Sequence, residues 1–248
     1  MGFLKKLFGG SEKFSLPDLS GIGTDVHSHL IPGIDDGVKT IEESIMLIKG
    51  LYELGYRKLI ITPHIMSDYY QNTPEIIRTG LLRVKEALSI EKIDMKVDAA
   101  AEYYLDFNFL EKIEKKELLT LGDNYVLFEL SYFNPPQNLN EVIFSLQTSG
   151  YKAILAHPER YVYWYNDFNK YVELKNRGVY FQLNINSLTG EYSVPTRKIA
   201  EKLIKEDFVN FLGTDMHHER HLNLLHEVLE NKHLFQLVTS GRIMNHTL

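Results

Sequence analysis

Short apolar runs alternate with longer amphipathic stretches along almost the whole of this sequence, and this alternation constrains the fold more than any other feature. Seven runs of about five to eight residues are rich in Val, Ile, Leu, Phe or Tyr, as buried parallel strands are. These runs are residues 21–27, 58–63, 95–101, 125–130, 152–156, 179–184 and 209–213.

Between the runs, apolar residues recur at steps of three and four, which is the spacing of an amphipathic helix. The stretches that show this spacing are residues 40–54, 74–89, 139–149, 195–204 and 220–230. Gly55, Gly150 and Gly178 follow stretches of this kind, at positions where a helix commonly stops.

Strand and helix alternate about seven times with short connections. This order predicts an α/β fold with a mostly parallel sheet, and 248 residues in one domain suit a TIM-like barrel. A doubly wound open sheet is the alternative, but no G-x-G-x-x-G or Walker-type loop follows the first run. We expect residues 1–20 to form a flexible tail, or a short amphipathic segment that touches a membrane, and residues 21–248 to form the barrel.

The composition argues against several classes of protein. A hydrophobic content of 44% and an aromatic content of 12% support a sizeable core. The formal net charge of −6 disfavours nucleic-acid binding, which rests on clustered Lys and Arg. Cysteine is absent, so the sequence holds no thiolate nucleophile or ligand, which fits a reducing compartment. No apolar run approaches the roughly 18 to 20 residues of a membrane-spanning helix, and we expect a cytoplasmic protein that reaches the inner face of the membrane only transiently.

Ionisable side chains stand just past the expected strands. They are His27, His29, His64, Glu102, Glu129, His157, Asp215 and His217. Because a parallel barrel brings the carboxyl ends of its strands to one face, side chains up to 190 residues apart converge there. A divalent-metal cluster would allow the carboxylates to stay ionised together, and imidazole with carboxylate suits Zn, Mn or Fe. For a single residue such as His64 or Glu129, a hydrogen-bonded structural role is the alternative.

Several motifs at these positions resemble those of a known superfamily. The first is DVHSHLIPGIDDG at residues 25–37, and the others are TPH ending at His64, AEYY around Glu102, FEL around Glu129, HPERY from His157 and TDMH ending at His217. Together they resemble the polymerase and histidinol phosphatase (PHP) superfamily. Within it, the sequence is most similar to the bacterial manganese-dependent protein-tyrosine phosphatases of capsule and exopolysaccharide synthesis. The resemblance runs from about residue 22 to residue 240.

The resemblance implies a distorted (β/α)7 barrel with three divalent metal ions, manganese being expected and iron or zinc the alternatives. One ion would be bound by His27, His29, Glu102 and Asp215. A second would be bound by His64, Glu129 and His157, with Glu102 as a bridge, and a third by Asp36 and His217. The motif favours Asp36 over its neighbour Asp35 as the ligand.

The same resemblance implies hydrolysis of phosphotyrosine by a hydroxide that bridges two metal ions. Arg160 would bind the substrate phosphate, and either His217 or a metal-bound water would give a proton to the leaving group. Arg220 is the candidate for a second phosphate-binding arginine, or else a solvated charge at the start of a helix. The protein partner implied is a tyrosine-autophosphorylating kinase of the polysaccharide export machinery.

An aromatic group close behind the expected ligands bears on the choice of substrate. Its members are Tyr103, Tyr104, Tyr132, Phe133, Tyr161, Tyr163 and Trp164. They would either line a mouth that accepts an aromatic ring or pack between loops. An open cleft would favour a phosphotyrosyl peptide, whereas an enclosed pocket would favour a small metabolite such as histidinol phosphate. The same barrel could instead serve as a nuclease, which the net acidity disfavours, or as an interaction module without chemistry, which the complete ligand set disfavours.

Overall fold

The structure, a computed structural model, describes residues 14–248. The strands are β1 (Thr24–Asp25), β2 (Lys58–Ile61), β3 (His64–Ile65), β4 (Lys96–Ala99), β5 (Glu102–Tyr104), β6 (Tyr125–Glu129), β7 (Lys152–Ala156), β8 (Tyr180–Asn184) and β9 (Phe211–Gly213). The helices are α1 (Ile41–Glu53), α2 (Pro74–Ile90), α3 (Phe107–Glu114), α4 (Leu139–Thr148), α5 (Asn169–Asn176), α6 (Val194–Lys205), α7 (Glu219–Val228) and α8 (Lys232–Thr239). Short 3₁₀ turns lie at Pro158–Arg160, Val162–Trp164, Ile185–Thr189 and Asn245–Thr247.

The strands form one parallel barrel in two hydrogen-bonded sheets, of order β1-β2-β4 and β3-β5-β6-β7-β8-β9. β3 continues β2 after a two-residue break, and β5 continues β4 in the same way. Across these breaks the pairing persists, because the Ala100 N–H donates to the Ile61 carbonyl at 2.9 Å and the Glu102 N–H to the Pro63 carbonyl at 3.1 Å. The barrel therefore has seven walls, which correspond to the seven predicted runs.

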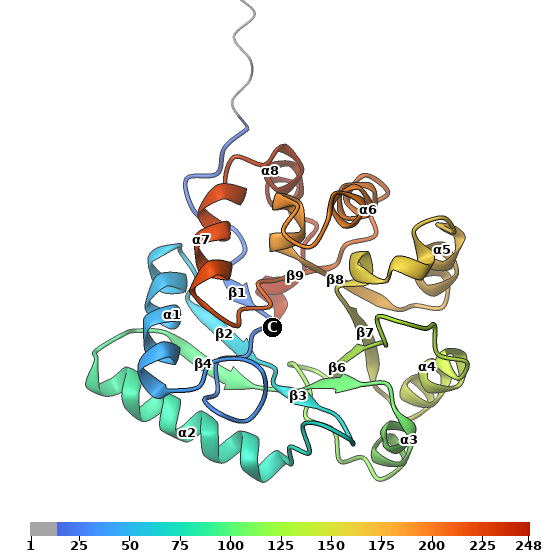
Figure 1. Cartoon of the computed structure of the whole chain (residues 1–248), viewed down its shortest axis with the longest axis horizontal. Helices are drawn as coiled ribbons and strands as arrows, with labels where there is room; N and C mark the ends of the chain where they lie inside the picture. Colours follow the sequence, from blue (N-terminus) through green and yellow to red (C-terminus); the bar gives the residue numbers. More distant parts are fainter. Residues whose placement is uncertain (1–13) are drawn as a thin grey trace, which may run out of the picture.

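The barrel closes between its first and last walls. Ser28 and Met216 form a parallel bridge, and the His29 N–H donates to the Met216 carbonyl at 2.9 Å. The Asp215 N–H also donates to the His27 carbonyl at 2.8 Å. Figure 1 shows the strands at the centre with the helices around them. The predicted fold class, a distorted (β/α)7 barrel, is confirmed.

All five predicted helices are present, with ends within two residues of the predicted ones. α3, α5 and α8 were not predicted. Each spans only eight residues, about two turns, which is too short for a three- and four-residue spacing to stand out. Side-chain caps start two of them: Asp106 accepts a hydrogen bond from the Asn108 N–H, and Asn231 accepts from the N–H of His233 and Leu234.

The interior of the barrel is apolar at the amino end of the strands. This layer consists of Val26, Ile60, Ala100, Leu121, Tyr125, Leu127, Ile154, Ala156 and Phe211. The chain end closes it from below, since the Asn245 side chain donates to the Thr24 and Leu212 carbonyls at 2.8 and 2.7 Å. Figure 1 shows the C-terminus at the middle of the ring. The carboxyl end of the same interior is left for polar side chains.

The segment before β1 bears on the expected domain boundary. Residues 1–13 of the expected tail lie outside the described residues. Leu16 and Leu19 are buried, and their N–H groups donate to the Leu229 and Leu54 carbonyls at 2.9 and 2.7 Å. The packed domain thus begins before residue 20, because apolar side chains in this segment cover the ends of the helices. Among the described residues, no helix has the length and apolar character needed to cross a membrane.

Candidate metal centre

All nine predicted ligands meet at the carboxyl ends of the strands. His64 lies in β3, Glu102 begins β5 and Glu129 ends β6, whereas the others lie on the loops that follow β1, β7 and β9. They form four overlapping groups whose ligand atoms lie within 4.8 Å of one another. The groups are His29, Asp36, His64 and His217; His27, His29 and Asp215; His27, Glu102 and His157; and His64, Glu102 and Glu129.

The first predicted ligand set surrounds one point in the structure. His27 Nε2 lies 3.1 Å from Glu102 Oε2 and 3.5 Å from Asp215 Oδ1. His29 Nε2 lies 3.4 Å from each of the same two oxygens, and the two Nε2 atoms are 3.2 Å apart. Ligand atoms about 2.1 Å from a shared ion are spaced by roughly 3.0 to 3.4 Å, so these distances fit the edges of a coordination polyhedron.

Glu102 faces two of the predicted sets at once. Its Oε1 lies 2.9 Å from His157 Nε2, while its Oε2 faces His27, His29 and His64. Glu129 completes this side, with Oε2 at 4.0 Å from His157 Nε2. A carboxylate whose two oxygens point to different groups of imidazoles has the geometry of a bridging ligand.

His64 lies between two groups rather than within one. Its Nδ1 is 3.1 Å from both Glu102 Oε2 and Glu129 Oε1, yet it is buried without a hydrogen-bond partner in acceptable geometry. Its Nε2 lies 3.4 Å from Asp36 Oδ1, which is also 3.4 Å from His217 Nε2. The third set, predicted as Asp36 and His217 alone, therefore gains His64 and His29 as neighbours. A buried His64 Nδ1 without a hydrogen-bond partner fits a site in which a bound cation is its partner.

Three buried side chains whose roles sequence reasoning missed orient the ligands. Gln182 Oε1 lies 2.7 Å from His27 Nδ1, and Asp35 Oδ2 lies 2.8 Å from His29 Nδ1. Because an amide oxygen and a carboxylate only accept, each Nδ1 carries the proton and each Nε2 is left free toward the cluster. The Asn184 amide donates to Asp215 Oδ2 at 2.9 Å. The available signals were the inward positions of Gln182 and Asn184 on β8 and the pairing of Asp35 with Asp36.

Backbone strain turns two ligands inward. His157 has φ 33° and ψ 56°, and Asp215 has φ 49°. Both lie in the left-handed region, which costs a residue with a side chain roughly 1–3 kcal/mol. Gly213 contributes by its lack of a side chain, since a Cβ there would lie 2.6 Å from the Cβ of His27. The surrounding barrel holds these conformations in place.

The carboxylates and imidazoles of the cluster shift one another's pKa. Burial alone would raise the pKa of Glu102, but the neighbouring His27 and His64 hold it well below its usual value. Burial alone would lower the pKa of His64, but Glu102 and Glu129 raise it to about 9. Burial likewise opposes the protonation of His27, and its pKa is nonetheless raised by Glu102 and Asp215. The cluster thus attracts positive charge, which a proton or a metal cation supplies.

The two predicted arginines have different surroundings. Arg160 Nη1 donates to Asp215 Oδ2 at 2.9 Å, and its guanidinium lies 4.2 and 4.7 Å from the ring centres of Tyr192 and Tyr132. Arg220 instead pairs with Glu191 at 2.8 Å, and its side chain is 70% exposed. Arg160 lines the cleft over the cluster, whereas Arg220 is not among the residues that line it.

The cluster lies at the base of a cleft of about 720 Å³. Of the predicted aromatic group, Tyr104, Tyr132 and Phe133 line it, together with the unpredicted Tyr69, Tyr70 and Tyr192. Tyr69 and Phe133 are 79% and 87% exposed, so the mouth of the cleft is open. The rest of the predicted group packs instead: Tyr103, Tyr161 and Trp164 are buried, and the Tyr163 hydroxyl donates to the Ser131 carbonyl at 2.9 Å.

Comparison with known proteins gives consistent matches over most of the chain. The family model described as "Capsular polysaccharide synthesis, CpsB/CapC" matches residues 23–227. The tyrosine-protein phosphatase CpsB of Streptococcus pneumoniae is 31% identical over 78% of this chain and 82% of its own length. The tyrosine-protein phosphatase YwqE of Bacillus subtilis is 26% identical over 80% of this chain and 79% of its own length.

One group of solved structures shares the fold. The crystal structures of YwqE and CpsB, described as "unique metal-dependent tyrosine phosphatases", match with a TM-score of 0.79 at 24% identity. The match covers 90% of this chain and 94% of the matched one. At this level of identity the likeness supports the barrel fold rather than the activity.

Proposed function

This chain belongs to the CpsB/CapC family of capsular polysaccharide synthesis, and on that premise we propose that it is a metal-dependent phosphatase that hydrolyses phosphotyrosine on proteins. Membership of the family confirms the resemblance that the motifs indicated. The observation that carries the proposal is the gathering of nine His, Asp and Glu side chains, seven of which line one open cleft together with Arg160. Such a set of donors beside a guanidinium suits a phosphate ester.

We assign three divalent ions to the cluster, manganese first and iron or zinc as alternatives. The donors are all nitrogen and oxygen, which suits these metals. One ion would be held by His27, His29, Glu102 and Asp215; one by Glu102, Glu129 and His157; and one by Asp36, His64 and His217. When bound, such ions lower the pKa of water and neutralise charge on a phosphoryl group.

Arg160 would bind the phosphate. Tyr132 and Tyr192 flank its guanidinium, and Asp215 holds one of its N–H groups, so the remaining N–H groups have a restricted orientation. A planar fork of donors fits two phosphate oxygens at once. The pre-set orientation reduces the side-chain entropy lost when substrate binds.

His217 fits the role of ligand better than that of proton donor. Its Nδ1 donates to the Asp215 carbonyl at 2.8 Å, which leaves Nε2 toward Asp36 without a proton. A tyrosyl leaving group, with a pKa of about 10, asks little of a general acid. We therefore revise the proton-donor role expected for His217 and keep it as a metal ligand.

The openness of the cleft supports a peptide substrate over a small metabolite. The rim residues Tyr69 and Phe133 are largely exposed and present rings to whatever enters. Aromatic rings of this kind stack on a tyrosyl ring. We propose as the protein substrate a tyrosine kinase of polysaccharide export, a proposal that rests on the family resemblance.

The test compares two substrates in the presence of Mn²⁺ or chelator. We expect the Mn²⁺-loaded protein to release phosphate from a phosphotyrosyl peptide and to leave histidinol phosphate largely intact, with activity lost in chelator and in His27→Ala. Preferential hydrolysis of histidinol phosphate would replace the protein substrate by a metabolite. Inactivity toward both substrates with the metal bound would overturn the phosphatase proposal.

A further inference from the structure

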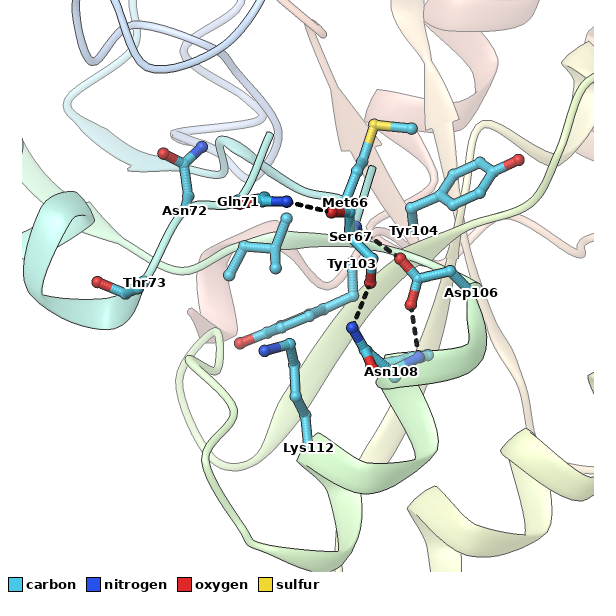
Figure 2. Close-up of a pocket in the computed structure, with 12 residues that line it drawn as sticks. Met66, Ser67, Gln71, Asn72, Thr73, Tyr103, Tyr104, Asp106, Asn108 and Lys112 are labelled. Atoms are coloured by element: carbon cyan, nitrogen blue, oxygen red, sulfur yellow. Dashed lines mark hydrogen bonds between the residues drawn. The ribbon is translucent and has the colours of Figure 1, made fainter. Parts of the chain in front are cut away.

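A second cavity, of about 220 Å³, adjoins the cleft on the outer side of the barrel wall (Figure 2). Met66 and Tyr104 line both spaces, so the two share a border. Ile65 and Tyr103, which line the second cavity but not the cleft, each stand one residue beyond the candidate ligands His64 and Glu102 on β3 and β5. Because side chains alternate along a strand, Ile65 and Tyr103 point away from the candidate ligands, and the cavity lies on the other side of the rim formed by Met66 and Tyr104.

The polar groups in the wall of this cavity are mostly committed to one another. Asp106 accepts hydrogen bonds from the N–H groups of Ser67 and Asn108 at 2.8 and 3.0 Å. The Asn108 amide donates to Ser67 Oγ at 2.9 Å, and the Asn72 amide donates to the His64 carbonyl at 2.8 Å. Figure 2 shows the bonds among Ser67, Asp106 and Asn108 along one side of the cavity. The wall is therefore preformed, and its one carboxylate is already satisfied.

Among the described residues, Lys112 is the one cation that lines this cavity, and its amine is not paired with the Asp106 carboxylate of the same wall. It is half-buried on α3, and across residues 14–248 no acidic group lies within ion-pair distance of its amine. The Tyr103 hydroxyl is buried and accepts a hydrogen bond from the Leu119 N–H at 2.7 Å, which fixes the ring in the wall of the cavity. Figure 2 shows the Lys112 side chain rising from α3 toward the Tyr103 ring.

The other charged residues near Lys112 do not add net positive charge to its own. Lys112 also lines a further cavity of about 450 Å³, where Arg78 and Lys116 are matched in number by Glu75 and Glu117. Within the described part of the chain, Lys112 is therefore the cation of this cavity that is left without an ion-pair partner, while backbone N–H groups hold the Asp106 carboxylate. The position of Lys112 favours the binding of an anionic group that belongs to the same molecule as the group bound in the cleft.

We propose that this cavity is a specificity subsite that binds the carboxylate of an Asp or Glu residue flanking the phosphotyrosine of the substrate. Lys112 supplies the charge that attracts this carboxylate. The inference rests on the proposed function, because it adds a second point of recognition to a phosphotyrosyl peptide. Free phosphotyrosine reaches the cleft alone and does not use the subsite.

The test measures kcat/KM for two phosphotyrosyl peptides, one with Glu on both sides of the phosphotyrosine and one with Gln in the same places. Free phosphotyrosine serves as the reference substrate for each variant. We expect the Mn²⁺-loaded protein to prefer the Glu peptide by about three- to fivefold at low salt, less at high salt. Lys112→Gln should remove the preference, and Lys112→Glu should reverse it, mainly through KM.

Lys115→Glu is the matched control, because Lys115 lies on the same helix end, pairs with Glu111 at 2.6 Å and does not line the cavity. It makes the same change in net charge and should keep the preference for Glu. Equal use of the two peptides by the unmodified protein, or a preference that survives Lys112→Glu, would overturn the subsite. Failure to hydrolyse free phosphotyrosine would instead count against the proposed phosphatase function.

Discussion

The two ends of the barrel interior are built on the same strands and hold opposite kinds of side chain. On β6, Tyr125 and Leu127 belong to the apolar layer, whereas Glu129, the next inward position, belongs to the cluster. On the last wall, Phe211 is apolar and Asp215 is a candidate ligand. A change of chemistry thus occurs within about four residues of strand.

This contrast separates stability from chemistry. The amino end is filled by close-packed apolar groups that need nothing more to be stable. The carboxyl end holds buried carboxylates and imidazoles whose mutual spacing of about 3 Å is favourable only when positive charge is shared among them. Substitutions at the two ends should accordingly affect different measurements.

The largest effect is expected from Glu102→Gln. The amide removes the charge of the group that faces two ligand sets while it keeps the size of the side chain. We expect kcat/KM for phosphotyrosine to fall by about a thousandfold or more, together with a loss of bound metal. Metal analysis and steady-state kinetics measure both. A folded variant that keeps activity within tenfold would remove Glu102 from the centre.

The opposite result is expected at the other end from Ile60→Ala. Ile60 is buried in the apolar layer of β2, and truncation leaves a cavity that costs about 3 kcal/mol of unfolding free energy. Denaturant unfolding measures this loss. Turnover per folded molecule should stay within about twofold of the unmodified protein. A large loss of turnover in the folded variant would mean that the two ends are not independent.

The two arginines at the carboxyl face sharpen the comparison further. Arg160→Ala should lower kcat/KM by about a hundredfold, because it removes charge-assisted hydrogen bonds to the phosphate. Arg220→Ala should change kcat/KM by less than about twofold, since its side chain is 70% exposed and pairs with Glu191 outside the cleft. Equal effects of the two substitutions would show that Arg220 reaches the substrate after all.

Glu159 provides a smaller test, at the edge of the site. Burial raises its pKa to about 7, and its Oε1 accepts from Ser187 Oγ at 2.7 Å and from the Asn184 N–H at 3.0 Å. Because the folded protein holds this proton more tightly, the stability it contributes is complete below pH 4.5 and is lost as the pH rises through 7.

Glu159→Gln mimics the protonated form, so it should match the unmodified protein in stability near pH 5. At pH 8 it should be more stable by about 2 kcal/mol. Urea unfolding in chelator at the two pH values measures the difference. An advantage for Gln that is the same at both pH values would show that ionisation of Glu159 is not the cause.

Much of the barrel could be predicted from its sequence because each wall is a compact apolar run. The breaks after Ile61 and Ala99 were not predicted, since each lies inside one of the predicted runs, 58–63 and 95–101. Short helices such as α3 were not predicted, because their caps rather than any periodicity of apolar residues define them. Local signals therefore located the walls but not the details of their connections.

The candidate ligands could be predicted because they follow the strands at equivalent positions. The place of His64 between two groups could not, because it depends on how Asp36 folds back over β3. Gln182 was missed because the sequence does not distinguish an amide inside a strand from an ordinary polar residue. Its role is seen only in the structure, where its Oε1 lies 2.7 Å from His27 Nδ1. Arg220 was the reverse case, a suitable residue type that the fold directs toward Glu191.

The most direct test of the metal centre is to locate manganese in a crystal. Anomalous diffraction from crystals grown with Mn²⁺ should show three peaks at the carboxyl end of the barrel, each about 2.2 Å from the nitrogen and oxygen atoms of one ligand set. His64 should bind the same ion as Asp36 and His217. An absence of peaks among these side chains, in crystals that show manganese elsewhere or not at all, would contradict the claim that this end of the barrel is a metal centre.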